Sequence, residues 1–221
     1  GATDKKFVRY WVHCNHLYVD GKKMSKSLGN FYTLRDLLSK GCDPMAFRYL
    51  CLSSHYRSQL NFTFSSLEKA KNTIDKFNDF VQRIKWLQNE VDAQPNNKLH
   101  LLIRKTKTNF KKYMDDDLNT PQALAAVFNL IKNVNTDIDK NKADKRTLQA
   151  VYKFLLEINQ IFDILREEKS DITEEEKSLI EQRENFRKDR NFAEADKIRA
   201  ILKGKGIILE DTPHGVRWKR K

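Results

Sequence analysis

The sequence is poor in glycine and has no long apolar run, and each of these features excludes some classes of protein. After Gly41, the next glycine is Gly204. Because glycine is the residue of tight turns, so long an interval without it favours helices joined by polar linkers. No apolar stretch reaches the roughly 18–20 residues that a membrane-spanning helix requires, which excludes a transmembrane protein. The 221 residues, with 33% charged side chains and a mean hydropathy of −0.71, describe a soluble folded chain of one or two modest domains.

Cysteine is also scarce. Cys14, Cys42 and Cys51 make an odd count with no C-x-x-C pair, which argues against a disulfide framework and for the reducing cytoplasm. We expect Cys42 and Cys51 to act as small buried hydrophobic residues, with a catalytic thiol as the alternative. His13, Cys14 and His16 supply three candidate metal ligands without a fourth, so a packed helix end is favoured over a zinc site.

The N-terminal residues GATDKKFVRYWVH include neither the apolar segment nor the cleavage site of a secretory signal. The sequence does not begin with methionine, and we expect it to be a piece of a longer protein.

The charge is strongly positive and unevenly distributed. A formal net charge of +12 and a pI near 9.5 predict attraction to a polyanion. Residues 98–112 carry six lysines or arginines and no acid, and the chain ends in RWKRK. At helical spacing the apolar residues of 98–112 share one face and the basic residues the other. Contact with RNA phosphates and plain solvation of the basic face both fit this pattern.

Several segments have the pattern of helices. Prolines occur where we expect helices to begin, at Asp43-Pro44, at Pro95 and at Asn119-Thr120-Pro121. Apolar residues recur every three or four positions over 124–138 and 148–165, and Thr173 with Glu176 forms a capping-box pattern. Together with residues 64–93, these segments predict five or six helices packed as a bundle, each with one buried stripe.

The two ends of the chain look different from the middle. The stretch HLYVDGKKM alternates around Asp20-Gly21, which predicts a strand leading into a loop, and Thr33 with Asp36 begins the next helix. Near the C-terminus, two β-like runs flank residues 211–215 and predict a hairpin. The predicted order is an α/β portion, a helical bundle and a small α+β unit.

Residues 23–30 read KMSKSLGN. Lys23 and Lys26, three positions apart on a mobile loop, can straddle a polyphosphate, because each supplies a compact charge with several N–H donors. Gly29 allows a tight change of backbone direction. Such a loop can stabilise the charge that develops when an α-phosphate is attacked and pyrophosphate leaves.

This string resembles the signature loop of class I aminoacyl-tRNA synthetases, and three later stretches resemble the cysteinyl-tRNA synthetases. Residues 53–64 (SSHYRSQLNFTF) resemble the segment after that loop, and residues 114–128 (MDDDLNTPQALAAVF) the opening of the helical bundle known as the DALR fold. Residues 183–218 resemble the small terminal domain of the bacterial members. The resemblance covers essentially the whole chain in the right order.

The resemblance implies a mainly α fold class with three parts. Residues 1–62 would form the end of a Rossmann-type α/β catalytic domain with the signature loop and a linking segment. Residues 63–170 would form an antiparallel, DALR-like helical bundle that binds tRNA. Residues 171–221 would form a small α+β anticodon-recognition domain.

The resemblance also implies a reaction. Members of the family use ATP, with Mg²⁺, to convert L-cysteine to cysteinyl-adenylate, and they then transfer the acyl group to tRNA-Cys. Lys26 would contact ATP and Lys23 would support the leaving pyrophosphate, both as catalytic residues. Met24, Ser25 and Ser27 would complete the ATP-binding loop.

The terminal domain of the family recognises the GCA anticodon. The aligned positions are Arg187, Phe192, Asp196 and Asp211. The family usually has Trp at the position of Phe192, and Phe can stack on a base but lacks the indole N–H donor. We expect Trp218, within the basic tail, to contact RNA as well, and residues 55–57 to lie near the inner face of the tRNA.

Other features of the family are not in this sequence. It has no His-Ile-Gly-His-type motif and none of the ligands of the zinc ion that recognises the substrate thiol, so we expect no metal site in this chain and no adenylate formation by it alone. We expect a monomer, and we expect the acidic run 115–117 to favour the positive end of the next helix rather than to bind magnesium. A free-standing tRNA-binding module is one alternative. A related ligase that joins cysteine to an aminosugar is another, although that relative lacks the anticodon-recognising end.

Overall fold

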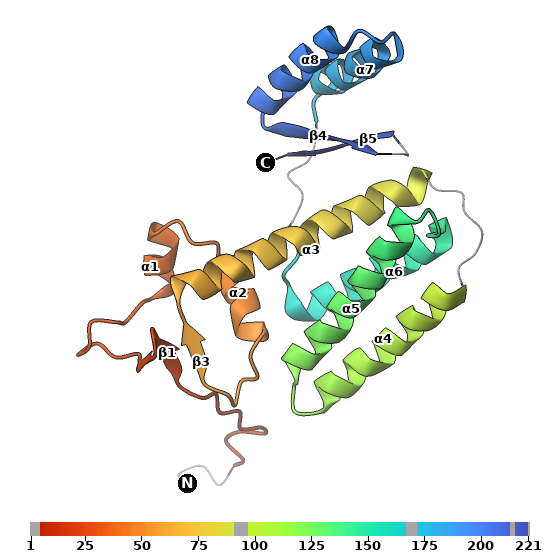
Figure 1. Cartoon of the computed structure of the whole chain (residues 1–221). Coiled ribbons are helices and arrows are strands. Elements are labelled where there is room, and N and C mark those ends of the chain that lie inside the picture. The colour runs from red at the N-terminus through yellow and green to blue at the C-terminus, as the bar shows by residue number, and fades with distance from the viewer. Residues whose placement is uncertain (1–4, 91–96, 167–171, 213–214, 221) are drawn as a thin grey trace.

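A computed structural model describes residues 5–90, 97–166, 172–212 and 215–220, and it shows a mainly helical chain with two small sheets (Figure 1). The elements in chain order are β1 (Leu17–Val19), β2 (Lys22–Lys23), α1 (Leu34–Ser39), α2 (Pro44–Leu52), β3 (Leu60–Phe62), α3 (Phe64–Glu90), α4 (Asn97–Asp115), α5 (Thr120–Asp139), α6 (Lys145–Phe162), α7 (Glu174–Lys188), α8 (Phe192–Gly204), β4 (Ile207–Thr212) and β5 (Gly215–Arg220). The predicted fold class is confirmed. Within the described ranges, no helix combines the length and the apolar character that crossing a membrane requires.

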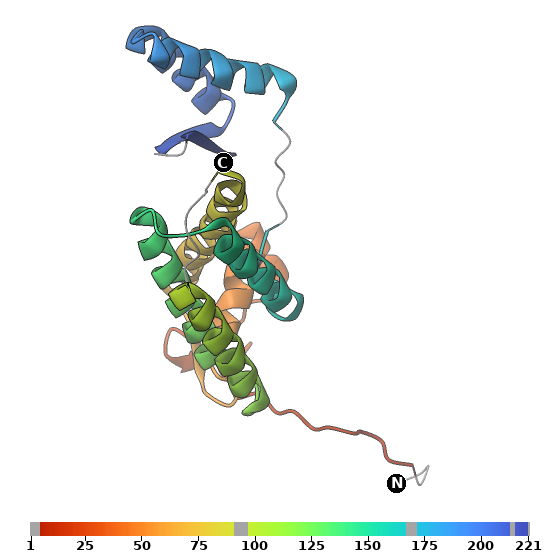
Figure 2. The ribbon, with the colours of Figure 1, turned by 90° about the vertical axis from the view of Figure 1, so that its right-hand side faces the viewer.

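The N-terminal part is a small α/β unit. Strand β1 pairs with β2 in antiparallel fashion and with β3 in parallel fashion, and α1 and α2 form the connection between β1 and β3. The predicted turn is present, because Asp20 and Gly21 have φ values of 49° and 77°. Val19, Leu50 and Phe62 lie in the buried core of this unit. The segment before β1 runs away from it and exposes Phe7 (Figure 2).

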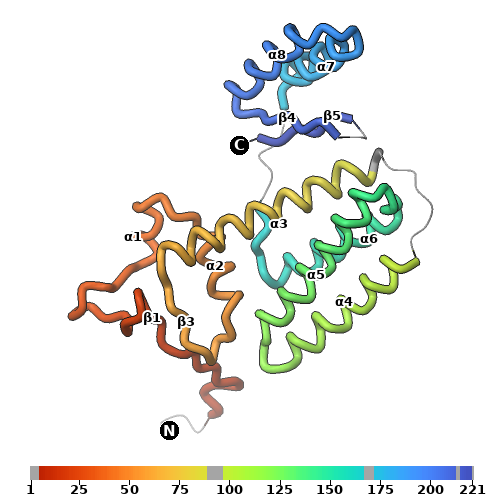
Figure 3. The backbone as a smooth tube through the Cα atoms, viewed as in Figure 1, coloured from red at the N-terminus to blue at the C-terminus, as the bar shows by residue number. Residues whose placement is uncertain are grey.

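Helices α3, α4, α5 and α6 form the central bundle (Figure 3). Ile74, Leu99, Leu130 and Leu155, one from each helix, are almost fully buried in its core. Four helices of the described chain build this core, fewer than the five or six expected. The helices α7 and α8 instead pack against the C-terminal hairpin, where Leu202 of α8 is completely buried.

Most helix starts predicted from local sequence are confirmed. Asp43 caps α2 with proline in its first turn, and Asn119 caps α5 in the same way. Thr173 and Glu176 form a reciprocal capping box at the start of α7. These starts depend on contacts within three residues, which is why the sequence alone reveals them. The start predicted at Pro95 lies outside the described residues.

The C-terminal hairpin lies between two helical layers (Figure 1). On one face Leu209 and its cross-strand partner Trp218 pack with α7 and α8. On the other face Arg217 points to α3, where its guanidinium donates to both the main-chain and the side-chain oxygen of Asp79. Arg217 is only 4% exposed, so this pair fixes the hairpin to the bundle through a largely buried charge.

Replacing Asp79 by alanine is expected to lower the free energy of unfolding by about 1–2 kcal/mol, because a buried guanidinium then loses its nearer carboxylate partner and keeps only Glu210, 3.8 Å away. Urea denaturation measures this change. The matched control is Asp139→Ala, which removes a carboxylate 2.7 Å from the more exposed Arg83 and should cost about 0.5 kcal/mol or less. Equal losses in the two variants would mean that burial of Arg217 does not strengthen the hairpin contact.

Candidate functional site

The signature loop leaves the α/β unit from an anchored base. The Met24 amide donates to the Leu17 carbonyl at 3.1 Å, and the Met24 side chain packs against the core of that unit. Asn30 ties the two sides of the loop together. Its Oδ1 accepts from the Ser25 amide at 2.9 Å, and its Nδ2 donates to the Lys23 carbonyl at 3.2 Å. The loop therefore has a fixed start and end, and the Lys23 side chain is exposed at its start.

The middle of the loop presents hydroxyl and ammonium groups to solvent. Gly29 has a φ of +67°, and its amide donates to the Lys26 carbonyl at 3.2 Å, which closes a tight turn. The Ser25 and Ser27 hydroxyls lie 3.2 Å apart. The Lys26 ammonium lies 5.7 Å from the centre of the Phe31 ring, within the range of a cation–π interaction. An anionic ligand can recruit this ammonium, because such a contact at an exposed site is weak.

A second polar cluster surrounds Asp211 on β4. Arg183 and Arg187, one helical turn apart on α7, both reach its carboxylate. Arg183 donates to Oδ1 at 2.6 Å and to Oδ2 at 3.0 Å, and Arg187 donates to Oδ2 at 2.5 Å. The hydrogen bonds from Arg183, followed by those from Arg187, lower the pKa of Asp211 to about 2. This carboxylate therefore acts only as an acceptor at neutral pH.

The helix α8 extends this cluster along its exposed face. Phe192, Asp196 and Arg199 are spaced at i, i+4 and i+7, so they lie on one side of the helix. All three are exposed, Phe192 to 58%. Arg199 Nη1 lies 3.9 Å from Asp211 Oδ2, which joins this face to the carboxylate.

Four of the five residues predicted to recognise RNA thus belong to one connected surface. The sequence reasoning missed Arg183 and Arg199, although a helical-spacing argument applied to the predicted positions would have found Arg199. Trp218 lies elsewhere, because its ring packs with the core shared by α7, α8 and the hairpin and is only partly exposed. Its contact with RNA stays a prediction.

Residues 55–57 join the α/β unit to the bundle. The rings of His55 and Tyr56 stack with centres 4.9 Å apart. The Tyr56 hydroxyl donates to Asp117 Oδ1 at 2.5 Å, and Arg57 Nε lies 2.9 Å from Asp117 Oδ2. The Asp117 carboxylate thus has cationic and hydroxyl partners of its own, and Asn119 caps the next helix. The favourable effect of the acidic run 115–117 on the positive end of that helix stays a prediction.

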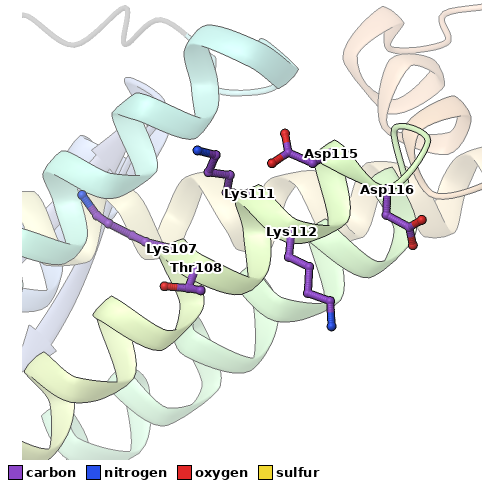
Figure 4. Close-up of a pocket in the computed structure, with 6 residues that line it drawn as sticks. All are labelled: Lys107, Thr108, Lys111, Lys112, Asp115 and Asp116. Carbon is purple, nitrogen blue, oxygen red and sulfur yellow. The ribbon is translucent and has the colours of Figure 1, made fainter.

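The basic face of α4 is partly used within the bundle. Lys107, Thr108, Lys111, Lys112, Asp115 and Asp116 line an open hollow on this helix (Figure 4). Lys107 pairs with Glu157 of α6 at 2.8 Å and lies over the Phe154 ring. In Figure 4, Lys112 points to the opposite side of the helix from Lys111. Lys111 and Lys112 are therefore better candidates for phosphate contact than Lys107.

Reversing the charge of Lys111 and Lys112 together, as Lys111→Glu/Lys112→Glu, is expected to weaken tRNA binding and to reduce the slope of log affinity against log salt by about two. Each lysine that meets a phosphate releases a counterion, so the slope counts the contacts. The control Lys132→Glu/Lys153→Glu makes the same charge change on exposed positions of α5 and α6. Unchanged affinity and slope in the first variant would leave solvation as the role of this face.

The cysteines and histidines form no metal centre in the part of the chain that the structure describes, where no three His, Cys, Asp or Glu side chains gather as ligands. Cys42 is only half-buried, against the core of the α/β unit, and Cys51 is exposed, so the expectation of two buried cysteines is met in part by Cys42 and is wrong for Cys51. Partial removal of its sulfur from water raises the pKa of the Cys51 thiol, which opposes a role as a reactive thiolate.

Two family descriptions match this chain. The one named tRNA synthetases class I (C) catalytic domain matches residues 1–72, and the one named DALR domain matches residues 109–166. The first match contains the signature loop, and the second contains the end of α4 with α5 and α6.

Curated proteins of one name match the chain from end to end. The cysteine–tRNA ligase of Brachyspira hyodysenteriae is 43% identical over 226 residues, which cover 100% of this chain and 47% of that protein. That of Protochlamydia amoebophila is 38% identical and that of Leptospira interrogans 40%, covering 100% and 99% of this chain and 46% and 47% of those proteins. The chain spans about half the length of these relatives. By these matches, the chain is similar over its whole length to proteins named cysteine–tRNA ligase.

Proposed function

We propose that this chain works as part of a cysteine–tRNA ligase, in which it supplies the signature loop and the surfaces that bind tRNA-Cys. The observation that carries the proposal is the whole-length similarity to ligases of that name, at 38–43% identity for three of them. Two surfaces support it: an anchored loop with exposed lysines, and an arginine–aspartate cluster on the terminal unit.

In the proposed first step, a carboxylate oxygen of L-cysteine attacks the α-phosphorus of ATP, and the bond to the β-phosphate breaks to release pyrophosphate. Lys26 contacts the triphosphate and Lys23 neutralises the leaving pyrophosphate, because both carry mobile ammonium groups near one another in sequence. Met24 anchors the loop, and the Ser25 and Ser27 hydroxyls add neutral donors. Mg²⁺ would accompany ATP as its counterion.

In the proposed second step, a hydroxyl of the terminal ribose of tRNA-Cys attacks the activated carbonyl, and AMP leaves. The described residues offer no ligand set that fits a zinc ion, and neither step is assigned to one. We assign residues 1–62 to the end of the catalytic domain, 63–170 to the tRNA-binding bundle and 171–221 to anticodon recognition. We also propose that the ligase is a cytoplasmic monomer.

Anticodon recognition is assigned to the cluster around Asp211. Its carboxylate, kept charged by Arg183 and Arg187, can accept from amino or imino groups of bases. Phe192 offers an exposed ring for stacking, and Asp196 a second acceptor on the same face of α8.

The test is equilibrium binding of the 221-residue chain to a tRNA-Cys transcript and to a transcript changed only in its GCA anticodon. We expect at least tenfold tighter binding to the natural transcript, because base contacts add to a common phosphate contribution. Equal affinity for both, falling steeply with salt, would mean that the chain contributes charge alone and would overturn the anticodon assignment.

Aminoacylation distinguishes this proposal from the alternatives. The complete ligase should transfer cysteine to tRNA-Cys, whereas a ligase for aminosugars would transfer it to the sugar and show no preference between the two transcripts. A binding module without a catalytic role would discriminate between anticodons, but substitutions in its signature loop would leave aminoacylation by the complete protein unchanged.

A further inference from the structure

Arg183 is the most deeply buried charged group of the terminal unit. Its side chain is 2% exposed, whereas Arg187 and Arg199, the other arginines near Asp211, are 38% and 49% exposed. Its guanidinium donates to Glu184 and to Asp211, yet its Nε is buried without a hydrogen-bond partner among the described residues. Burying a charge that has an unsatisfied donor lowers the free energy of unfolding, so packing alone does not explain an arginine at position 183.

The contacts of the Asp211 carboxylate differ between its two oxygens. Arg183 holds both of them in a two-point fork, with donor–acceptor distances of 2.6 and 3.0 Å. Arg187 touches only Oδ2, where Arg199 also approaches. Each carboxylate oxygen can accept about two hydrogen bonds. Oδ2 accepts from both Arg183 and Arg187, whereas the fork gives Oδ1 a single donor, so Oδ1 retains capacity for a further one.

The two arginines on α7 therefore have different freedom. Arg183 cannot leave the carboxylate without leaving its buried position. Arg187 is accessible to solvent and makes a single contact, so a ligand can displace it at little cost. A carboxylate held by a planar fork keeps its orientation, and orientation decides which donor on a base edge it can accept.

We propose that Arg183 is a positioning residue for anticodon recognition: it fixes the plane of the Asp211 carboxylate so that Oδ1 accepts an N–H group of one anticodon base, while Arg187 is the partner that RNA displaces. This inference rests on the proposed function. It adds a residue that makes no contact with RNA itself and acts only through Asp211.

The experiment measures discrimination, defined as the ratio of affinities for the natural and the anticodon-changed tRNA-Cys transcripts. Arg183→Lys keeps the positive charge but replaces the two-point fork by a single ammonium, and we expect discrimination to fall about tenfold. The affinity of this variant for the anticodon-changed transcript should stay within about twofold of that of the unsubstituted chain, because no phosphate contact is lost. Lys188→Met removes an exposed charge five residues later on α7. It should weaken binding of both transcripts alike and preserve discrimination.

A double-mutant cycle separates positioning from general stabilisation. Arg183→Met and Asp211→Asn are made singly and together, and the double variant removes both the buried cation and the carboxylate of residue 211, while Glu184 loses its contact with residue 183. If Arg183 acts only through Asp211, adding Arg183→Met to Asp211→Asn should not change discrimination further. Circular dichroism melting identifies any variant that does not fold. If Arg183→Met alone does not fold, Arg183→Lys and the double variant still test the proposal.

The outcomes distinguish the two proposals. Equal binding of both transcripts by the unsubstituted chain would overturn anticodon recognition and this inference with it. Discrimination by the unsubstituted chain that a folded Arg183→Lys variant retains would overturn the inference alone. A further loss of discrimination from Arg183→Met in the Asp211→Asn background would also overturn it, because Arg183 would then act by another route.

Discussion

Replacing Lys26 by alanine in the complete ligase is expected to slow ATP–pyrophosphate exchange by about 10²–10³-fold, the usual loss when one donor to a developing charge is removed. The ammonium group lies on a loop whose base is tied by Asn30, and Lys23, the other lysine of the loop, lies at that base and has a separate proposed role. The dissociation constant for tRNA-Cys should stay the same, because the loop belongs to the α/β unit, whereas the cluster around Asp211, proposed to recognise the anticodon, belongs to the terminal unit.

The control for this prediction is Lys22→Ala, which removes an exposed ammonium from β2 just before the loop and should leave exchange within about twofold of normal. Exchange at the normal rate in Lys26→Ala would refute the assignment of this lysine to the triphosphate. Loss of tRNA binding together with exchange would instead indicate that the substitution disturbs the fold.

Replacing Asp211 by alanine is expected to lower the free energy of unfolding of the chain by about 2 kcal/mol at pH 7. It removes the carboxylate that holds the buried Arg183 guanidinium at two points and leaves that cation with Glu184 alone. The loss should fall below the 3–5 kcal/mol typical of a fully buried pair, because the Asp211 side chain is 37% exposed and solvent screens part of the attraction. The same variant should lose discrimination between anticodons.

The effect of this substitution should depend on pH in one direction. The arginines depress the pKa of Asp211 to about 2, below its ordinary value of 3.8. Its contribution to stability is therefore complete above about pH 4 and is lost as the pH falls toward 2. Urea denaturation at pH 7 and at pH 3 should show a smaller difference between the unsubstituted chain and Asp211→Ala at pH 3.

Asp196→Ala is the matched control, because Asp196 is exposed on α8 and its removal should change stability by about 0.5 kcal/mol or less at either pH. A difference between the unsubstituted chain and Asp211→Ala that stays constant from pH 7 to pH 3 would show that the ion pair with the arginines does not set the pKa of Asp211.

The features that could be predicted from the sequence are those that depend on near neighbours in the chain. Asn119 and Thr173 cap their helices through side-chain contacts with amides three residues away, and Asp20-Gly21 makes its turn with its own backbone angles. The recurrence of apolar residues every three or four positions predicted the buried stripes of the bundle, because a helix turns by a fixed angle per residue. The signature loop and the positions of Arg187 and Asp211 were also identified in the sequence, from a resemblance between short strings.

Contacts between groups far apart in the sequence could not be predicted, because they depend on how the helices and the hairpin pack. Arg217 reaches Asp79 across 138 positions, and Asp117 reaches Tyr56 across 61. In the sequence, Arg183 does not differ from the other charged residues of a polar helix. In the fold, the hairpin places Asp211, 28 positions later, within hydrogen-bond distance of it. Local sequence determines the helices and turns because their energies come from adjacent residues, whereas the partner of a buried charge depends on how those elements pack.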